Sequence, residues 1–473
     1  MVSQSAMAML GVAIAALLAT PFVAPPDIAQ RLKSSVGADA DLDGSSVLPE
    51  VPGVEAFPGA EGYGRRSRGG RGGAIIPVTT LADHGPGSLR ACIEAKGPRT
   101  CVFRVSGVIR FTTRRPIITN PYITIAGQTA PGGGILVTHG GGADGYTPII
   151  AKDTHDVIIR HIRVRTDLNA EDRGSNSSFL FENSKNVIFD HVSGAWAQDQ
   201  IMSGYSHNDN ITVSNSIFVQ GIPRHDKCAL LASNPKAPQK LSFIRNLCAH
   251  NGDRNPDVNF MPQSCVEILN NVFYNGDSQF TEVHEVFGGT PVSIVGNVYR
   301  KGPNSADMIP AIDRVLDSST GESKIFMADN KLDKVRVLKT ATVDSSLVSR
   351  PVCPLSTRLL PAEQAYVQVL DQAGAFPRDP LDVRTVAEVR ARTGTIIHDV
   401  AMRNGPRPLP AIAPGTPYVD LDEDGMADSW ERANGLDPRR DDAWQDVDHD
   451  RWLNFDEFLD FAHREVMAGR QIP

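Results

Sequence analysis

Short β-branched and apolar runs recur along the middle of the chain, and all but the first are followed by a polar residue, or finally a glycine, in a corresponding place. The runs are Tyr122–Ile125, Val157–Ile159, Val187–Phe189, Ile211–Val213, Ser242–Ile244, Val266–Ile268 and Val292–Ile294. The following positions are His161, His191, Asn215, Asn246, Asn270 and Gly296, which lie 24 to 31 residues apart. Periods in this range, with one strand signal per unit, indicate a solenoid.

The repeating units are rich in Asn, Gly and Thr, and they lack the 3.6-residue apolar periodicity of helical solenoids. The pattern therefore predicts an all-β fold, a right-handed parallel β-helix whose strands stack about 4.8 Å apart. The polar positions are expected to form a ladder in which side-chain amides bond their neighbours in adjacent coils. For His161 and His191 this structural role is favoured over catalysis, because neither belongs to a recognisable base constellation.

Five parts are expected along the chain. Residues 1–24 are predicted to be an export signal, since Ala6 to Phe22 is apolar and rich in small residues, although no Lys or Arg precedes it. A linker (25–53), the β-helix (54–345), a C-terminal wrap with a Pro-rich linker (346–414) and an acidic tail (415–473) follow. No other segment is apolar enough over a sufficient length to cross a membrane. We therefore expect a secreted or periplasmic monomer that has no membrane contact after signal removal.

The six cysteines fit an oxidising compartment. Cys92 closes a predicted short helix and Cys101 opens the next strand, a separation that a helix-to-strand turn can bridge, so a disulfide is predicted between them. Six cysteines allow 15 pairings. The partners of Cys228, Cys248, Cys265 and Cys353 stay open, and buried free thiols are the alternative.

A pair of basic residues gives the repeat a possible function. Arg254 lies in the segment Asn251–Pro256, and Lys227 lies one repeat upstream, next to Arg224 and His225. Guanidinium and ammonium groups both bind sugar carboxylates. An arginine and a lysine one coil apart therefore suggest a cationic cleft for an acidic polysaccharide, with Lys227, His225 and Arg224 as substrate-binding residues.

Several ordered segments resemble pectate-lyase-like proteins of polysaccharide lyase family 1. They are Phe57–Gly64, Gly69–Gly73, Gly85–Arg90, Ile125–Gly134, the pair Asp190–His191 and Val266–Gly276. The resemblance covers roughly Val54 to Gly302. Strings of this length and order are more specific than a single short motif.

The resemblance implies β-elimination, in which a base removes the proton α to a uronate carboxylate and the glycosidic oxygen leaves from the adjacent carbon. The carboxylate must be neutralised to stabilise the developing charge, and calcium and basic side chains can supply this. Arg254 matches the family's catalytic arginine in its Arg-x-Pro context, for which the resemblance implies a general base. Lys227 resembles the substrate-binding lysine. A guanidinium has an ordinary pKa above about 12, so it can act as a base only if its pKa is lowered or if it transfers the proton while paired to the substrate.

The chain also departs from the family pattern. Asp257 and Asn259 stand where a second arginine is expected, and Ser178 and Ser203 stand at two positions of calcium-binding acids, which leaves Asp199. Calcium usually takes several carboxylates. Calcium in the cleft is therefore expected to be weak, recruited by the substrate, or absent. Other acidic residues nearby in sequence are Asp167, Glu171, Asp172 and Glu182.

Two acidic loops near the C-terminus share the spacing of an EF-hand-type calcium loop. Their oxygens at positions 1, 3, 5, 9 and 12 come from Asp420, Asp422, Asp424, Asp428 and Glu431, and from Asp446, Asp448, Asp450, Asn454 and Glu457. Met426 and Trp452 would supply the carbonyls at position 7. The first loop keeps the turn glycine, Gly425, whereas the second has Arg451 there, which predicts weaker binding. A similar pattern from Asp39 to Glu50 is more often a linker than a site.

Charge separates the tail from the rest of the chain. Residues 415–473 hold 16 acidic and 6 basic side chains, a net charge of −10, whereas the whole chain carries −8. The remainder is slightly basic and suits a polyanionic substrate, while an acidic exported chain does not suit nucleic acid. The aspartate cluster that β-helix hydrolases use is missing, because the only adjacent Asp pair, Asp441 and Asp442, lies in the tail.

We therefore predict a lyase for a pectate-like, uronate-containing polysaccharide, with calcium as a cofactor. Two alternatives stay open. One is a non-catalytic β-helix that binds acidic glycans, and the other is a lyase for another uronate polymer.

Overall fold

The computed structural model describes residues 55–139, 147–166, 176–223, 225–398 and 409–473. The predicted signal (1–24), the linker (25–53) and Arg224 lie outside the described residues, as do Asp167, Glu171 and Asp172. Among the described residues, every helix is too short or too polar to span a lipid bilayer.

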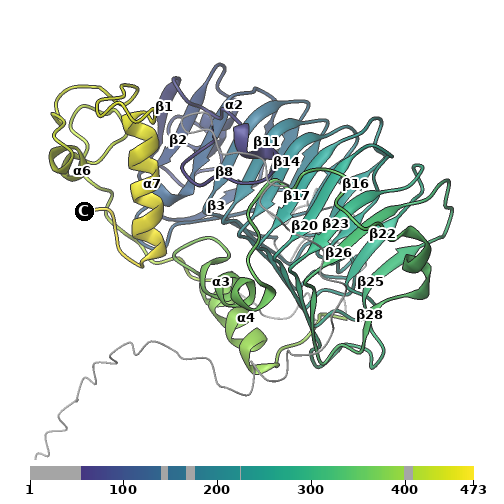
Figure 1. The fold of residues 1–473 in the computed structure, drawn as a ribbon. Coiled ribbons are helices and arrows are strands. Elements are labelled where there is room, and N and C mark those ends of the chain that lie inside the picture. The colour runs from purple at the N-terminus through teal and green to yellow at the C-terminus, as the bar shows by residue number, and fades with distance from the viewer. Residues whose placement is uncertain (1–54, 140–146, 167–175, 224, 399–408) are drawn as a thin grey trace, which may run out of the picture. The chain divides into compact units, whose positions relative to one another are not determined.

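The described strands form three parallel sheets, and successive coils add one strand to each sheet in turn (Figure 1). The first sheet has ten strands, and the second and third have nine each. Neighbouring strands in each sheet come from consecutive coils, as in the pairs β8 with β11, β10 with β13 and β12 with β15. The predicted all-β fold, a parallel β-helix, is confirmed.

The strand bounds are as follows. The first sheet contains β1 (Ala74–Val78), β2 (Arg99–Phe103), β5 (Ile123–Ala126), β8 (His155–Arg160), β11 (Lys185–Asp190), β14 (Asp209–Ser214), β17 (Lys240–Ile244), β20 (Cys265–Leu269), β23 (Pro291–Val295) and β26 (Lys324–Ala328). The second contains β4 (Ile117–Ile118), β7 (Ile149–Lys152), β10 (Phe179–Glu182), β13 (Met202–Tyr205), β16 (Ala229–Ser233), β19 (Asp257–Val258), β22 (Thr281–His284), β25 (Pro310–Val315) and β28 (Val337–Lys339). The third contains β3 (Gly107–Phe111), β6 (Ile135–His139), β9 (Ile162–Arg165), β12 (Ser193–Ala195), β15 (Ile217–Val219), β18 (Leu247–Ala249), β21 (Val272–Tyr274), β24 (Val298–Arg300) and β27 (Lys331–Asp333).

The recurring apolar runs of the sequence are the strands of the first sheet. Their inward side chains stack in register from coil to coil, and all are fully buried: Ile125, Ile159, Phe189, Val213, Phe243, Ile268 and Ile294. Alternate residues of a strand point to opposite faces. One column of large apolar side chains therefore fills the interior from β5 to β23.

The polar positions after these strands divide into two neighbouring columns. His161, His191, Asn215, Asn270 and Gly296 occupy left-handed turns, with φ between 48° and 68°. Such turns favour Asn and Gly. The amide ladder lies one residue further on, where Asn246, Asn271 and Asn297 each donate from Nδ2 to Oδ1 of the next amide at 3.0 to 3.2 Å, and Asn330 is the last acceptor. An amide ladder is present, but the prediction of its members was wrong except for Asn246, because the other predicted positions are turn residues. Arg245 takes the turn position of the Asn246 coil.

The six cysteines form three disulfides. They are Cys92–Cys101, which is the pair expected from the sequence, Cys228–Cys248 and Cys265–Cys353. The second joins neighbouring parts of the stack, and the third ties β20 to the segment after the last described strand.

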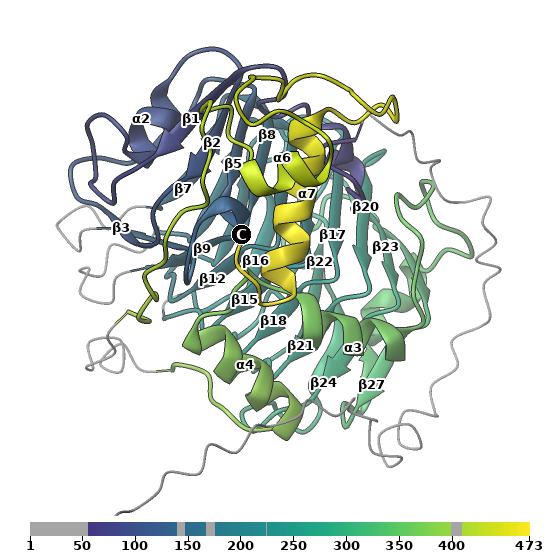
Figure 2. The ribbon, with the colours of Figure 1, turned by 90° about the vertical axis from the view of Figure 1, so that its left-hand side faces the viewer.

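The helices lie between and after the coils. They are η2 (Tyr63–Arg66), α2 (Leu89–Glu94), η3 (Gly127–Thr129), η4 (Ala341–Ser346), α3 (Ala362–Gln372), α4 (Pro380–Ala391), α6 (Asp428–Ala433) and α7 (Asn454–Met467). Asp379 caps α4 by accepting from the backbone N–H of Asp382, and Pro380 follows at the first helical position. Helices α3 and α4 cover the third sheet through an apolar cluster with Val219, Ala249 and Val272 (Figure 2).

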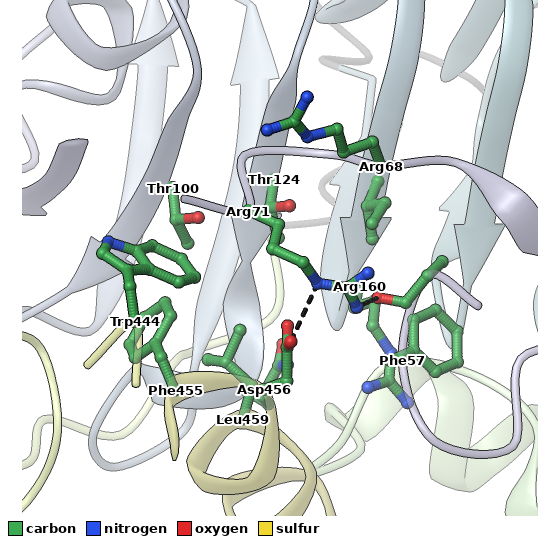
Figure 3. Close-up of a pocket in the computed structure, with 13 residues that line it drawn as sticks. Phe57, Arg68, Arg71, Thr100, Thr124, Arg160, Trp444, Phe455, Asp456 and Leu459 are labelled. Atoms are coloured by element: carbon green, nitrogen blue, oxygen red, sulfur yellow. Dashed lines mark hydrogen bonds and ion pairs between the residues drawn. The ribbon is translucent and has the colours of Figure 1, made fainter. Parts of the chain in front are cut away.

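The acidic tail shares an apolar cluster with the first coils. Val102 and Ala126 of the first sheet pack with Met426, Trp430 and Phe455 of the tail. Figure 3 shows the polar contacts at this junction, where Nε of Arg71 lies 2.8 Å from a carboxylate oxygen of Asp456 on α7. The tail is therefore joined to the β-helix by a mixed apolar and ionic contact.

The two turn histidines also contact the tail helix. His161 Nδ1 accepts from the backbone N–H of Phe376 at 3.1 Å, and its Nε2 lies 2.9 Å from Nδ1 of His463 on α7. Nδ1 of His191 lies 2.8 Å from Asp190, and its ring stacks on that of His161. These contacts support a structural role for both histidines.

Candidate active site and calcium loops

Arg254 lies three residues before β19, in a left-handed turn with φ of 49°. Its backbone N–H donates to Oε1 of Glu282 at 3.0 Å, and its Nε lies 3.6 Å from Oδ2 of Asp257. The side chain is 26% exposed. Acidic side chains thus contact both the backbone and the guanidinium of Arg254, and the guanidinium is still partly exposed to solvent.

Lys227 lies on the preceding coil, two residues before β16. The backbone N–H groups of Cys228 and Ala229 donate to the carbonyls of Asp253 and Arg254, so the Lys227 and Arg254 segments are hydrogen-bonded neighbours. Nζ of Lys227 forms an ion pair with Asp253. The structure therefore brings the two basic residues together as the sequence predicted.

Asp199 and His225 form the next pair along this face. Their segments make an isolated parallel bridge, and Nδ1 of His225 lies 2.7 Å from Oδ1 of Asp199. Burial, followed by the charge of Asp199, raises the pKa of Tyr205, and the charge of Arg254 opposes that rise. Tyr205 therefore lies within electrostatic reach of both residues. The sequence had not singled it out.

Among the residues that the structure describes, the positions that the family pattern assigns to cleft calcium do not come together as a ligand group. Asp199 joins no group of three potential metal ligands there. Ser203 Oγ hydrogen-bonds Ser177 Oγ at 2.8 Å, and Glu182 pairs with Lys152 at 2.9 Å. These side chains are occupied by protein partners, so they do not fit a shared ion.

A compact acidic and imidazole group lies beside Arg254. Val258 and Val283 are fully buried in the core, so the alternate residues Asp257, Glu282 and His284 face outward on β19 and β22. Nδ1 of His284 lies 2.9 Å from Oδ1 of Asp257 and 3.9 Å from Oε2 of Glu282.

The pKa values of this group follow from its crowding. Burial, followed by the charges of Asp257 and Asp253, raises the pKa of Glu282 to about 7. Burial lowers the pKa of His284, but the hydrogen bond and charge of Asp257 outweigh it and leave the pKa raised. His284 and Glu282 were not predicted as site residues. Of these three residues, the sequence marked only Asp257, because it stands where the family pattern is expected to have a second arginine.

The first tail loop brings its acidic residues together. Carboxylate oxygens of Asp420, Asp422 and Asp424 lie within 4.8 Å of one another, and so do those of Asp424, Glu431 and Asp442. Within the described part of the chain, Oδ1 of Asp420, Oδ2 of Asp422 and both carboxylate oxygens of Glu431 are buried without a hydrogen-bond partner. Oxygen donors of this kind are the ligands that calcium prefers.

Like charges and burial shift the pKa values in this loop. Burial, with added repulsion from Asp424 and Asp422, raises the pKa of Glu431 to about 8. Burial likewise raises the pKa of Asp424 to about 7 and that of Asp420 to about 6. A divalent cation would relieve this repulsion, so the loop fits calcium.

One predicted ligand of the first loop faces elsewhere. Oδ1 of Asp428 accepts from the backbone N–H of Leu421 at 2.9 Å, and its Oδ2 pairs with Arg432 at 2.8 Å. Asp442, which lies outside the loop in sequence, stands next to Asp424 and Glu431 instead. The loop spacing alone did not point to Asp442.

The second loop is more open. Oxygens of Asp446, Asp448 and Asp450 lie within 4.8 Å of one another, and burial with the charges of Asp448 and Asp450 raises the pKa of Glu457 to about 7. Asn454 instead donates from Nδ2 to the carbonyl of Asp442 at 2.9 Å, which links the two loops.

Comparisons with known proteins identify sequence relatives of the chain. No family model matches the chain. It is 33% identical over 407 residues to a probable pectate lyase C of Aspergillus fumigatus, which covers 83% of this chain and 90% of that protein. It is 32% identical over 409 residues to the probable pectate lyase C of Aspergillus flavus, which covers 84% and 92%.

Solved structures with a similar fold include jun a 1, the major allergen from cedar pollen, with a TM-score of 0.48 and 16% identity over 67% of this chain and 92% of that one. Another is pectate lyase II of Xanthomonas campestris, with a TM-score of 0.44 and 14% identity over 67% and 98%.

The sequence relatives, together with the parallel β-helix, identify the chain as a polysaccharide lyase. On the strength of its sequence relatives, the chain belongs to the pectate lyase family. The predicted family and the predicted lyase class are confirmed.

Proposed function

We propose that the protein cleaves a pectate-like, uronate-containing polysaccharide by β-elimination. The observation that carries this proposal is the placement of Arg254 and Lys227 on hydrogen-bonded neighbouring coils of one face. Two cationic residues on neighbouring coils, whose backbones lie roughly 4.8 Å apart, suit successive carboxylates of an acidic polymer better than a single charged group would. The family relatives are probable pectate lyases, which supports the same substrate class.

Arg254 is proposed to bind the carboxylate of the uronate whose α-proton is removed. The carboxylate of Asp257, 3.6 Å from its Nε, orients the guanidinium. A planar cation can pair with a carboxylate through two N–H groups and can stabilise the negative charge that develops on it. Lys227 would hold a neighbouring sugar, and His225 would contact the chain beyond it.

The two tail loops are proposed to bind calcium. In the first loop, Asp420, Asp422, Asp424, Glu431 and Asp442 would hold the ion, and in the second loop Asp446, Asp448, Asp450 and Glu457 would do so. Calcium there would neutralise crowded carboxylates and tighten the tail against the first coils. No chemical step is assigned to it, and none is assigned to calcium at Asp199.

Export to an oxidising compartment is also proposed. Three disulfides, Cys92–Cys101, Cys228–Cys248 and Cys265–Cys353, tie the described chain together. Disulfides persist mainly outside the cytosol. Mass spectrometry of the protein from its native source tests this proposal, because it should show oxidised cysteines and a mature N-terminus near residue 25.

Product analysis tests the reaction. The protein should be incubated with polygalacturonate, and the oligosaccharide ends should be identified by NMR. β-Elimination creates a double bond at the new non-reducing end, whereas hydrolysis adds water. Saturated ends would contradict the lyase proposal, and binding without cleavage would favour the non-catalytic alternative.

A further inference from the structure

We propose that Asp257, Glu282 and His284 form a binding site for a divalent transition-metal ion such as Zn²⁺, and that a uronate carboxylate completes its coordination. The ion-binding site stands apart from the proposed lyase function, whereas the role given to the uronate rests on it. The ion would help Arg254 to neutralise the substrate carboxylate, and no proton transfer is assigned to the ion or to its ligands.

The three side chains come together because two neighbouring coils are in register. Asp257 on β19 pairs directly with Glu282 on β22, and His284 follows two residues later on the same strand. Residues two apart in a strand share a face, so all three side chains leave the outer face of the second sheet. Two hydrogen-bonded strands, and not a loop, therefore fix the arrangement.

The ligand atoms lie at distances that one ion can bridge. Nδ1 of His284 lies 2.9 Å from Oδ1 of Asp257 and 3.9 Å from Oε2 of Glu282. One ligand atom from each residue falls within 4.8 Å of the other two. Bonds of about 2.0–2.2 Å from zinc to nitrogen and carboxylate oxygen place neighbouring ligand atoms roughly 3–4 Å apart. The group therefore has the dimensions of a three-ligand metal site.

One oxygen in this group has no hydrogen-bond partner. Oε1 of Glu282 accepts from the backbone N–H of Arg254 at 3.0 Å and from Nε2 of Gln279 at 2.9 Å. Among the described residues, no hydrogen bond reaches Oε2, although Glu282 is only 4% exposed and this oxygen is the one directed at His284. A nearly buried carboxylate oxygen without a partner is costly, and a bound cation would satisfy it.

The charge balance also favours a second cation. Asp257 and Glu282 are both nearly buried, and Nε of Arg254 lies 3.6 Å from Oδ2 of Asp257. One guanidinium therefore serves two carboxylates, while Oδ1 of Asp257 stays on the side of His284. Burial, followed by the charges of Asp257 and Asp253, raises the pKa of Glu282 to about 7, which reflects the same excess of negative charge.

The donor set separates this group from a calcium site. Calcium takes oxygen ligands, such as those of the tail loops, whereas an imidazole nitrogen suits zinc and related first-row ions. Catalytic zinc sites commonly have three protein ligands and leave a further position for water or substrate. The His284 side chain is 19% exposed beside Arg254, so a polymer in the cleft can reach that position.

Calorimetric titration with Zn²⁺ tests the site. The full-length protein is stripped with a chelator, dialysed, and kept in excess calcium so that the oxygen ligands of the tail are occupied. The cleft variants are His284→Gln and Glu282→Gln. The matched control is His155→Gln, because Nδ1 of His155 also lies 2.8 Å from an aspartate, Asp156, but joins none of the described groups of three potential ligands.

A second control concerns the other described group that offers imidazole ligands. It consists of His161, His191 and His463, at the contact between the β-helix and the tail helix. His463→Gln shows whether Zn²⁺ binds there instead. Thermal melting of each variant confirms that it folds.

The wild-type protein should bind one Zn²⁺ ion that both cleft variants bind at least about 10- to 100-fold more weakly. Loss of a direct ligand should cost at least as much affinity as loss of an outer-shell partner. His155→Gln and His463→Gln should keep the wild-type affinity. Zn²⁺ should also tighten the binding of a galacturonate oligomer to the wild type, but not to folded His284→Gln protein.

Unchanged Zn²⁺ affinity in the folded cleft variants, or loss of the ion in His463→Gln alone, would overturn the site. Cleft binding of Zn²⁺ that leaves the affinity for the oligomer unchanged would overturn the role given to the uronate. A protein that releases unsaturated product and binds no Zn²⁺ would keep the proposed lyase function and lose this inference. A protein that binds Zn²⁺ at these residues and cleaves no uronate polymer would keep the site and lose the lyase function.

Discussion

The Nε of Arg254 lies 3.6 Å from Oδ2 of Asp257, three residues further along the chain. This contact places a partly exposed guanidinium on a carboxylate that is itself buried. A cation held in this way keeps a fixed direction and still presents its remaining N–H groups to a ligand. This contact with Asp257 is the structural basis for the proposal that Arg254 binds the uronate carboxylate.

Replacing Arg254 tests that assignment. Arg254→Ala should lower kcat/KM on polygalacturonate by at least about 100- to 1,000-fold, because a preorganised donor to the developing negative charge is lost. Arg254→Lys should restore little, since a single ammonium cannot pair through two N–H groups. Initial rates of unsaturated product release measure both.

The matched control for this prediction is Arg350→Ala, because Arg350 is exposed in the segment that follows the last coil. It should retain the wild-type rate. Near-normal activity of a folded Arg254→Ala enzyme would remove Arg254 from the active site.

Lys227 should contribute mainly to binding. Lys227→Met should raise KM for polygalacturonate by about 10- to 100-fold, which corresponds to the loss of one charge-assisted hydrogen bond, while kcat changes less. Its ion pair with Asp253 is partly exposed, so the fold should survive the change. Lys324→Met, at an exposed position on the first sheet, is the control. A fall in kcat with unchanged KM would contradict the binding role.

The strands could be predicted from the sequence because their signal is local. Ile159, Phe189 and Val213 each lie in a short apolar run, and stacking them in register buries all three. The proximity of Lys227 and Arg254 followed from the same repeat. Both inferences need only the spacing of one coil.

The rest of the site depends on contacts between coils of unequal length. Asp257 and His284 are 27 residues apart, and no local motif marks their meeting. Asp442 likewise approaches Asp424 only because the chain turns back between the two tail loops. The sequence gives the residue types, but the packing of the intervening segments decides which side chains meet.

Two neighbouring aspartates provide a sharp test of the first calcium loop. Asp442→Asn should weaken calcium binding by the full-length protein by about tenfold or more, because one carboxylate ligand loses its charge. Asp441 is exposed and joins none of the described ligand groups, so Asp441→Asn should bind like the wild type. Calorimetric titration of calcium into chelator-treated protein measures both. Equal affinities would exclude Asp442 as a ligand.

Calcium should also change how stability depends on pH. Without calcium, Glu431 and Asp424 have raised pKa values of about 8 and about 7 in the folded protein, against ordinary values of 4.5 and 3.8. Groups with raised pKa values favour the folded state below their ordinary pKa, and that contribution is lost as pH rises towards the folded value. The chelated protein should therefore lose stability between about pH 4 and about pH 8.

Bound calcium compensates for that repulsion, so the difference in Tm between calcium-loaded and chelated protein should widen over the same pH interval. Differential scanning calorimetry at pH 5 and pH 8, with and without chelator, measures it. A difference in Tm that stays constant or narrows as pH rises would contradict a carboxylate site in the tail.

The most direct measurement is the ultraviolet absorbance of unsaturated uronide during incubation of the purified protein with polygalacturonate. The wild-type enzyme should produce a steady rise in absorbance, and Arg254→Ala should produce almost none under the same conditions. No rise with the wild type on any uronate polymer, together with measurable binding of the polysaccharide, would contradict the lyase assignment and leave an acidic-glycan-binding β-helix.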